Sequence, residues 1–368
     1  MQYKEHQSHL KFKNINGNKF YITLRKRVDE YFTENNLHRF ANRQMIIKSV
    51  ILLFFYVAPF FALPLVSFPF SLLLWLLMGL AMAGVGMSVM HDANHGSYSH
   101  SQKVNAIMSF TLNMCGASIF NWRLQHNVLH HTFTNVTHAD DDISDRGILK
   151  FSPHYKTGFI HRFQWLYAFM FYGLITLNWV FMKDFLQFFQ YIKNGVNNRT
   201  TKENVLVFLK IVAVKLCYLF VVWGIPVWLW DMSFAQVLIG FIIMHFVAGN
   251  ILTIVFQLAH TVEGTDFPLP NQEGFIENEW AIHQLCTTVN FSKKNKWLSW
   301  YLGGLNFQIE HHLFPKISHV HYPAISEIVK KTALEFNLPY HENATFFKAL
   351  KSHMRMLKSI GQIHHAHI

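Results

Sequence analysis

Cysteine is scarce in this chain of 368 residues, which contains only Cys115, Cys217 and Cys286. None of the three belongs to a Cys-x-x-Cys pair, so the sequence predicts neither a disulfide framework nor a thiolate metal site. Any metal must therefore be bound by other side chains. Histidine, with 24 residues, is the obvious source of ligands.

Charge is scarce as well. Charged residues make up 14% of the chain, whereas 51% is hydrophobic and 16% is aromatic. This balance is well on the apolar side for a soluble protein and points to the bilayer. Several apolar runs reach the roughly 20 residues that a helix needs to cross a hydrocarbon core of about 30 Å. The sequence therefore predicts an all-α integral membrane protein.

A cleaved signal peptide is not expected, because the first 45 residues are polar where a signal peptide has its apolar core. The first membrane helix is expected to act as the signal. Much of the formal net charge of +11 lies in this segment, and the positive-inside rule makes residues 1–44 a basic cytoplasmic segment. Topology and attraction to anionic headgroups explain the basic excess better than nucleic-acid binding, since nothing resembles a nucleic-acid module.

Three short histidine clusters interrupt the apolar sequence: His91-Asp-Ala-Asn-His95, His126-Asn-Val-Leu-His130-His131 and Gln308-Ile-Glu-His311-His312. Histidines four residues apart lie on one face of an α-helix, with Cβ atoms about 5 to 6 Å apart, so their rings can converge on one metal. Adjacent histidines project about 100° apart and can serve two neighbouring ions. Seven imidazoles are too many for one ion, and imidazole suits iron, copper and zinc, so two metals are the simplest interpretation.

His260, at the end of the fourth predicted membrane helix, is the best single candidate for an eighth ligand. For any one histidine the alternative is an ordinary polar role at a helix end. Three clusters, each just beyond a hairpin, favour function instead. His245, within the fourth helix, is expected to hydrogen-bond a neighbouring helix. The terminal histidines 364, 365 and 367 are expected to form a disordered end.

Acidic residues accompany the clusters. Asp92 and Glu310 lie inside the first and third clusters, and Asp141 lies in the acidic run 140–142 that follows the second. We consider these three as outer partners that accept hydrogen bonds from ligand imidazoles. The alternative for the acidic run is a solvated loop.

Four segments read as transmembrane helices in two hairpins: residues 45–68, 70–90, 205–230 and 234–258. The stretch 163–182 is also long enough to cross, but its crossing would place the third cluster opposite the first two. We therefore expect it to lie in the membrane interface, where aromatic residues are typical. Both termini then face the cytoplasm. Residues 45–368 form one domain, with a cytoplasmic helical cap that holds a di-metal site.

The motifs HxxxH, HxxxHH and QxxHH, in this order around two apolar hairpins, resemble the membrane fatty acid desaturases over roughly residues 40–340. Gln308 stands where many desaturases have the first histidine of the third box. The phrases HDANHGS, HNVLHH, DDD and QIEHHLFP are similar to the front-end branch, which acts on acyl-lipid or acyl-CoA substrates. The resemblance implies oxygen-dependent introduction of a cis double bond into a long-chain fatty acyl group by a non-haem di-iron centre.

The resemblance also implies a ligand set for two iron ions, with no catalytic residue beyond the metal centre. These ligands are His91, His95, His126, His130, His131, His260, His311 and His312. Gln308 is implied to be a weak ligand or a hydrogen-bond donor to bound water or oxygen. Some relatives hold a metal-bound water with an asparagine where this chain has Phe256, so that contact is not implied here.

The resemblance bears on the electron donor too. Front-end desaturases of eukaryotes often carry an N-terminal cytochrome b5 domain with a His-Pro-Gly-Gly motif, which is absent from this sequence. Electrons are therefore expected from a separate ferredoxin or cytochrome b5, for which a basic surface is suited. The compact length favours a bacterial enzyme of the inner membrane.

Two other functions stay open from the sequence. A membrane di-iron lipid hydroxylase or alkane monooxygenase begins with the same C–H cleavage, although the particular motifs favour desaturation. A histidine-rich metal transporter fits less well, because transport sites usually lie near the bilayer midplane on broken helices. The clusters here fall beyond the ends of the predicted spans.

Overall fold

The computed structural model describes residues 10–363, so the prediction for the terminal histidines lies outside the described residues. The chain divides into two compact units. The first unit comprises Met1–Phe40, Leu124–Ala168 and Val255–Ile368, and the second comprises Ala41–Arg123 and Phe169–Ile254.

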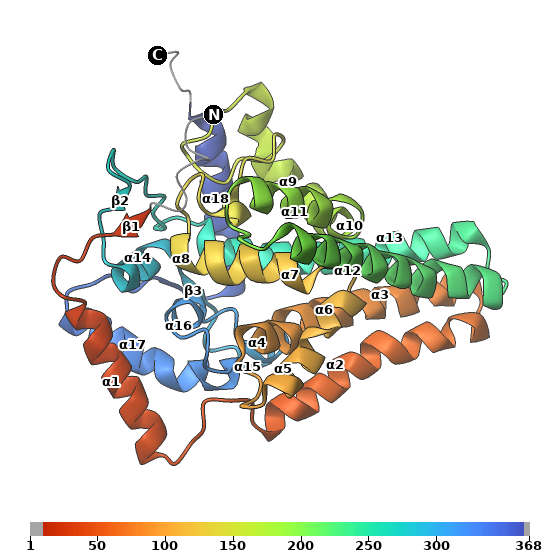
Figure 1. The fold of residues 1–368 in the computed structure, drawn as a ribbon, viewed down its shortest axis with the longest axis horizontal. Coiled ribbons are helices and arrows are strands. Elements are labelled where there is room, and N and C mark those ends of the chain that lie inside the picture. Colours follow the sequence, from red (N-terminus) through yellow and green to blue (C-terminus); the bar gives the residue numbers. More distant parts are fainter. Residues whose placement is uncertain (1–9, 364–368) are drawn as a thin grey trace. The chain divides into compact units, whose positions relative to one another are not determined.

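The second unit is built from helices. Its elements are α2 (Arg43–Ala62), η2 (Leu63–Leu65), α3 (Phe68–Gly84), η3 (Val85–Val89), α4 (Met90–His95), α5 (Gln102–Ser109), α6 (Thr111–Met114), α7 (Ile119–Trp122), α10 (Ile175–Asn178), η7 (Trp179–Lys183), α11 (Asp184–Lys193), α12 (Thr201–Leu219), η8 (Phe220–Leu229) and most of α13 (Phe234–His260). Helices α2 and α3 pack side by side as a hairpin (Figure 1).

Within residues 10–363, four helices are long and apolar enough to cross a membrane: Arg43–Leu65, Phe68–His95, Thr201–Leu229 and Phe234–His260. These candidate helices match the predicted spans in number, and their bounds lie within a few residues of the predicted ones. Phe68–His95 has 28 residues, which at 1.5 Å per residue gives about 42 Å. This length exceeds a hydrocarbon core of about 30 Å, so the helix is long enough to cross the core with residues to spare. The chain is an all-α membrane protein, as predicted.

Local capping sets where two of these spans begin. The Asn42 side chain accepts a hydrogen bond from the backbone N–H of Met45 at 3.1 Å and caps α2. Thr200 and Glu203 form a capping box at the start of α12, since each side chain accepts from the other's backbone N–H. These polar residues satisfy donors that the first turn of a helix leaves unpaired.

The apolar stretch predicted to lie in the interface is two helical segments, Phe159–Tyr172 and Ile175–Lys193, which meet at 62°. In the second unit, Lys215 on α12 fixes the later segment. Its ammonium group donates to the carbonyls of Gly116 and Trp179, each at 2.6 Å, and pairs with Asp184. The stretch is therefore bent rather than one straight span, and its position relative to a bilayer stays a prediction.

The first unit holds the remaining elements. They are β1 (Lys11–Phe12), α1 (Lys19–Glu34), η4 (Arg123–His130), α8 (His131–Phe133), η5 (Asp141–Ile143), η6 (Phe159–Phe163), the start of α9 (Gln164–Tyr172), the last turn of α13, β2 (Phe275–Ile276), α14 (Trp280–Thr287), β3 (Asn290–Phe291), α15 (Lys296–Tyr301), α16 (Gln308–Leu313), η9 (His319–His321), α17 (Tyr322–Glu335), β4 (Glu342–Asn343) and α18 (Phe346–Gln362). Its short strands pair in parallel, β1 with β2 and β3 with β4.

A hydrophobic core joins α1, α14, α16 and α17 in the first unit. Helix α1 contributes Phe20, Leu24, Val28 and Phe32 at helical spacing, and packs along α17 (Figure 1). Ile309 and Leu313 place α16 in the same core. The helix that carries the third histidine cluster is therefore held by buried apolar contacts.

Candidate metal centre

Six of the eight predicted histidine ligands belong to the first unit. His126 and His130 lie on η4, His131 begins α8, His260 ends α13, and His311 and His312 lie on α16. All six are buried, and His130, His260, His311 and His312 have no exposed surface. Buried imidazoles so close together are costly unless they are hydrogen-bonded or bind an ion.

The second cluster lies on a π-helix rather than on the α-helix that its spacing predicted. Residues Arg123–His130 form this π-helix, a geometry frequent at functional sites. It still places His126 and His130 on the same side, with their rings stacked and the centroids 5.3 Å apart. Spacing alone did not distinguish the two helix types, because four residues is close to one turn in both.

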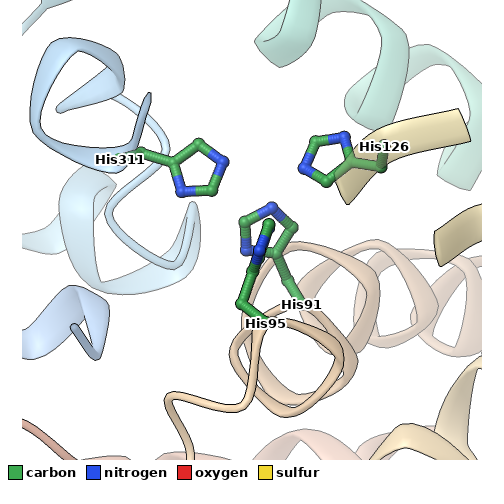
Figure 2. A group of neighbouring side chains, drawn as sticks. All are labelled: His91, His95, His126 and His311. Carbon is green, nitrogen blue, oxygen red and sulfur yellow. The ribbon is translucent and has the colours of Figure 1, made fainter. Parts of the chain in front are cut away.

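Two groups of three histidines in the first unit have the geometry of metal ligands. In the first group, His130, His260 and His312, one ring nitrogen from each residue lies within 4.8 Å of the others. In the second, His131, His311 and His312 meet the same criterion. His126 extends the cluster, since its ring lies 5.8 Å from that of His311 (Figure 2). The two triads overlap at His312, so their five histidines form one continuous cluster of candidate ligands.

Asp140 orients His130. Its carboxylate lies 2.9 Å from Nδ1 of His130 and accepts the backbone N–H of Asn135 at 2.9 Å. The Asn135 side chain in turn donates to the carbonyl of His260 at 2.8 Å. Burial alone lowers the pKa of His130, but the charge of Asp140, its hydrogen bond and the charge of Asp142 outweigh burial and raise it above the ordinary value.

This arrangement leaves one nitrogen of His130 for a ligand. With Nδ1 held by Asp140, Nε2 is buried and has no hydrogen-bond partner among residues 10–363. A carboxylate behind a histidine is the usual way in which proteins fix the tautomer and direction of a metal-binding ring. The sequence singled out Asp141 of the acidic run, whereas the bond to His130 belongs to Asp140. Position in the sequence did not separate the three adjacent aspartates.

Gln284 on α14 is a functional residue that the sequence did not reveal. Its side-chain oxygen lies 2.8 Å from Nδ1 of His312 and accepts the hydroxyl of Thr134 at 2.8 Å. Its amide nitrogen donates to the carbonyl of His131 at 3.2 Å. One buried amide therefore holds residues of the second and third clusters. A glutamine far from any histidine motif carries no local signal of this role.

Gln308, predicted as a weak ligand or donor, lies among the ring nitrogens. Its side-chain nitrogen is 2.9 Å from Nε2 of His260 and 3.4 Å from Nε2 of His312. The ring of Phe256 lies 4.6 Å from that of His260 and 5.0 Å from that of His130. An apolar ring thus lies beside His260, and Gln308 supplies the nearby amide.

Glu310 fixes the third cluster through its own helix. Its carboxylate accepts from the Asn290 amide at 2.8 Å and from the Tyr340 hydroxyl at 3.0 Å. The other end of the Asn290 side chain accepts the backbone N–H of Ile309 at 3.0 Å. Burial raises the pKa of Glu310 to about 7, although the hydrogen bond from Asn290 and the charge of Lys293 favour the ionised form.

The first cluster belongs to the second unit. His91 and His95 lie on α4, as their spacing predicted, with ring centroids 4.7 Å apart (Figure 2). Both rings lie edge-on to Trp122, at 5.7 and 5.8 Å. Gly96 ends the helix immediately after His95 with φ of 74°, a conformation that glycine adopts without strain. Asp92, between the two histidines, is buried.

His245, by contrast, has the structural role predicted for it. In the second unit its Nε2 lies 2.8 Å from the Tyr218 hydroxyl and its Nδ1 lies 3.0 Å from the Thr176 hydroxyl. Both ring nitrogens are engaged by neighbouring helices. The predicted helix-to-helix hydrogen bond is confirmed.

A prediction follows for Gln284. Gln284→Leu removes the partner of His312 and the donor to His131 while keeping a side chain of similar size. We expect metal affinity, and the activity that depends on the metal, to fall by roughly 10- to 100-fold, because the ring of His312 loses the partner that fixes its direction. Competition with a chromogenic chelator measures the metal affinity, and a turnover assay measures the activity. Gln272→Leu, at an exposed glutamine of the same unit, is the control and is expected to leave both unchanged.

Fold and site together define the class: an integral membrane protein with a buried, multi-histidine centre suited to metal. The fatty acid desaturase family model matches residues 67–344. The chain belongs to the fatty acid desaturase family, and it is an enzyme that introduces double bonds into fatty acids.

Individual relatives agree with this family. An sn-1 linoleoyl-lipid 6-desaturase of Synechocystis sp. is 36% identical over 358 residues, covering 96% of this chain and 98% of that protein. An acyl-lipid (8-3)-desaturase of Physcomitrium patens is 36% identical over 360 residues, covering 96% and 74%. An sn-1 linoleoyl-lipid 6-desaturase of Arthrospira platensis is 33% identical over 345 residues, covering 92% and 91%. The hydroxylase alternative is not favoured.

Proposed function

We propose that this enzyme desaturates a long-chain acyl group while the group is esterified to a membrane lipid, with two iron ions as its metals. The observation that carries the proposal is the pair of histidine triads. Asp140 lies against Nδ1 of His130, and Gln284 lies against Nδ1 of His312. The names of the relatives, which specify lipid-linked acyl substrates, support the lipid carrier. An acyl-CoA substrate is the alternative carrier.

The proposed ligands are the six histidines of the first unit together with His91 and His95. An all-nitrogen set without cysteine suits non-haem iron better than an iron–sulfur cluster. When bound, the ions supply the chemistry that activates O2 and breaks two alkyl C–H bonds. The overall reaction consumes one O2, two electrons and two protons, and yields the alkene and two waters.

The protein's own residues have defined parts in this proposal. Asp140 and Gln284 orient the rings of His130 and His312. Gln308 places an amide beside His260, where it can hydrogen-bond a small molecule at the metals. Asp92, Asp141 and Glu310 are proposed as outer residues, and Glu310 acts by fixing α16. The burial of the histidines keeps water away from the reacting groups.

The remaining parts of the proposal concern the surroundings of the enzyme. We place both termini and the histidine clusters on the cytoplasmic side of a bacterial inner membrane, which the basic N-terminal segment supports through the positive-inside rule. A separate ferredoxin or cytochrome b5 supplies the electrons one at a time. The formal charge of +11 favours an acidic carrier.

The deciding experiment is expression in a host that lacks the product, followed by gas chromatography and mass spectrometry of the fatty acids. A new double bond in acyl chains of intact lipids is expected, and a hydroxylated chain would overturn the reaction. Supplying isotope-labelled phospholipid or labelled acyl-CoA to membranes distinguishes the carriers. Purified enzyme is expected to contain two irons per chain by elemental analysis, and zinc or copper in their place would overturn the choice of metal.

A further inference from the structure

Helix α15 presents aromatic and basic side chains to the outside of the first unit. Trp297 has 84% of its surface exposed and Trp300 has 36%. Lys294 and Lys296, on either side of the helix start, are exposed and form no ion pair among residues 10–363. We name these four residues the α15 patch. The neighbouring Lys293 differs, since it is paired with Glu342 at 3.2 Å.

The exposure of Trp297 is built into a well-fixed helix. The Asn295 side chain caps α15 by accepting the backbone N–H of Leu298 at 3.0 Å. The Ser299 hydroxyl donates to the carbonyl of Asn295 at 3.0 Å and accepts from the Asn306 side chain at 2.9 Å. Leu302, just after the helix, is buried. These hydrogen bonds and the burial of Leu302 fix the helix, and the indole of Trp297 is left exposed.

An indole in this position is suited to a membrane interface. Tryptophan places its apolar ring among acyl chains and its N–H among headgroups, which is why it gathers at both edges of membranes. Trp228, in the last turn of the apolar helix Thr201–Leu229, has a similar exposure of 74%. Unpaired lysines beside such a ring are attracted to anionic headgroups within a Debye length.

We propose that the α15 patch is an interfacial anchor that inserts Trp297 and Trp300 among lipid headgroups and pairs Lys294 and Lys296 with anionic lipids. Asn306 connects the patch to the segment that precedes the third histidine cluster. Its side chain donates to the hydroxyl of Ser299 on α15, and its backbone carbonyl accepts the N–H of Phe291. Lipid contact at α15 therefore fixes the segment that precedes Gln308. The anchor does not depend on which metal the histidines bind or on the acyl carrier.

A fluorescent label at position 297 tests the anchor in the full chain, reconstituted in lipid nanodiscs. Trp297→Cys is made together with Cys217→Ala, which removes the exposed native thiol. Cys115 is buried, and burial raises the pKa of Cys286 to about 11, so neither competes for the label. Lys26→Cys in the same background is the control, because that side chain is 76% exposed on the charged helix α1.

We expect nitroxide-bearing lipids to quench the label at position 297 at least about twofold more than the label at position 26. Acrylamide, a quencher in the water, is expected to show the opposite order. Adding anionic phosphatidylglycerol should strengthen the lipid quenching at position 297. Lys294→Gln with Lys296→Gln should abolish that increase, while iron content and fatty acid products stay unchanged.

Two outcomes would overturn the anchor. A label at position 297 that acrylamide quenches as strongly as the control faces water. A label protected from both quenchers is covered by protein, either a second copy or a partner. If Trp297→Cys fails to fold, the intrinsic fluorescence of Trp297 is measured instead, as the difference between the parent enzyme and Trp297→Phe. This fluorescence is expected to be blue-shifted and quenched by brominated lipids.

Discussion

His130→Ala is expected to abolish desaturation while the protein still inserts in the membrane. His130 takes part in the triad with His260 and His312, and its Nε2 is the buried nitrogen that Asp140 leaves available. Removing one imidazole ligand takes away a donor nitrogen and with it the coordination geometry that the metal needs. Gas chromatography of the host's fatty acids measures the loss, and metal analysis is expected to find fewer irons per chain.

His154→Ala is the matched control for this variant. His154 is an exposed histidine of the same unit, and its ring contacts the backbone carbonyl of Phe267 at 2.7 Å. We expect wild-type product and wild-type iron content from it. Full desaturase activity in His130→Ala, at equal expression in the membrane fraction, would show that His130 is not a ligand.

Asp140→Asn should have the next largest effect. The change keeps the size and shape of the side chain but removes the charge that holds Nδ1 of His130. Losses of roughly 10- to 100-fold in metal affinity or activity are typical when such an outer carboxylate is removed. The carboxylate also accepts the N–H of Asn135, whose side chain bonds the carbonyl of His260. The substitution therefore reaches two ligands of one triad.

Chelator competition at fixed pH measures the metal affinity, and product analysis at saturating iron measures the activity. Asp266→Asn is the control, since this exposed aspartate of the same unit contributes its backbone carbonyl to Asn135 and keeps it after the change. If Asp140→Asn binds iron as tightly as the parent enzyme, the bond to His130 has no part in metal binding. A much larger loss in Asp141→Asn would assign the supporting role to Asp141, the aspartate chosen from the sequence.

The membrane architecture was predictable because it depends on local composition. An apolar run of about 20 residues has few alternatives to a helix that crosses a bilayer, and a helix long and apolar enough to cross lies at each of the four predicted positions. Capping residues such as Asn42 and Thr200 mark their starts in the sequence as well as in the structure. The 62° bend between Tyr172 and Ile175 falls at Gly173 and Leu174, within an apolar run that composition alone does not divide.

The candidate ligands were predictable for a related reason. Histidines one turn apart share a helix face whatever surrounds them, so the pairs His91/His95 and His126/His130 could be named before the fold was known. That six of the eight lie buried in one unit could not be read from the sequence. The π-helical form of Arg123–His130 also escaped prediction, because π and α geometry place residues four apart on nearly the same side.

The sequence by itself determined that this is a membrane protein, that it is helical, and which side chains can bind metal. Each of these properties follows from the chemistry of short segments. Only the tertiary structure decided which residues hold those side chains in place. Asp140, and not Asp141, lies against His130, and Gln284 reaches His312 from a distant helix. Glu310 accepts hydrogen bonds from Asn290 and Tyr340. Hydrogen bonds between distant segments depend on three-dimensional packing, and no pattern of neighbours along the chain encodes them.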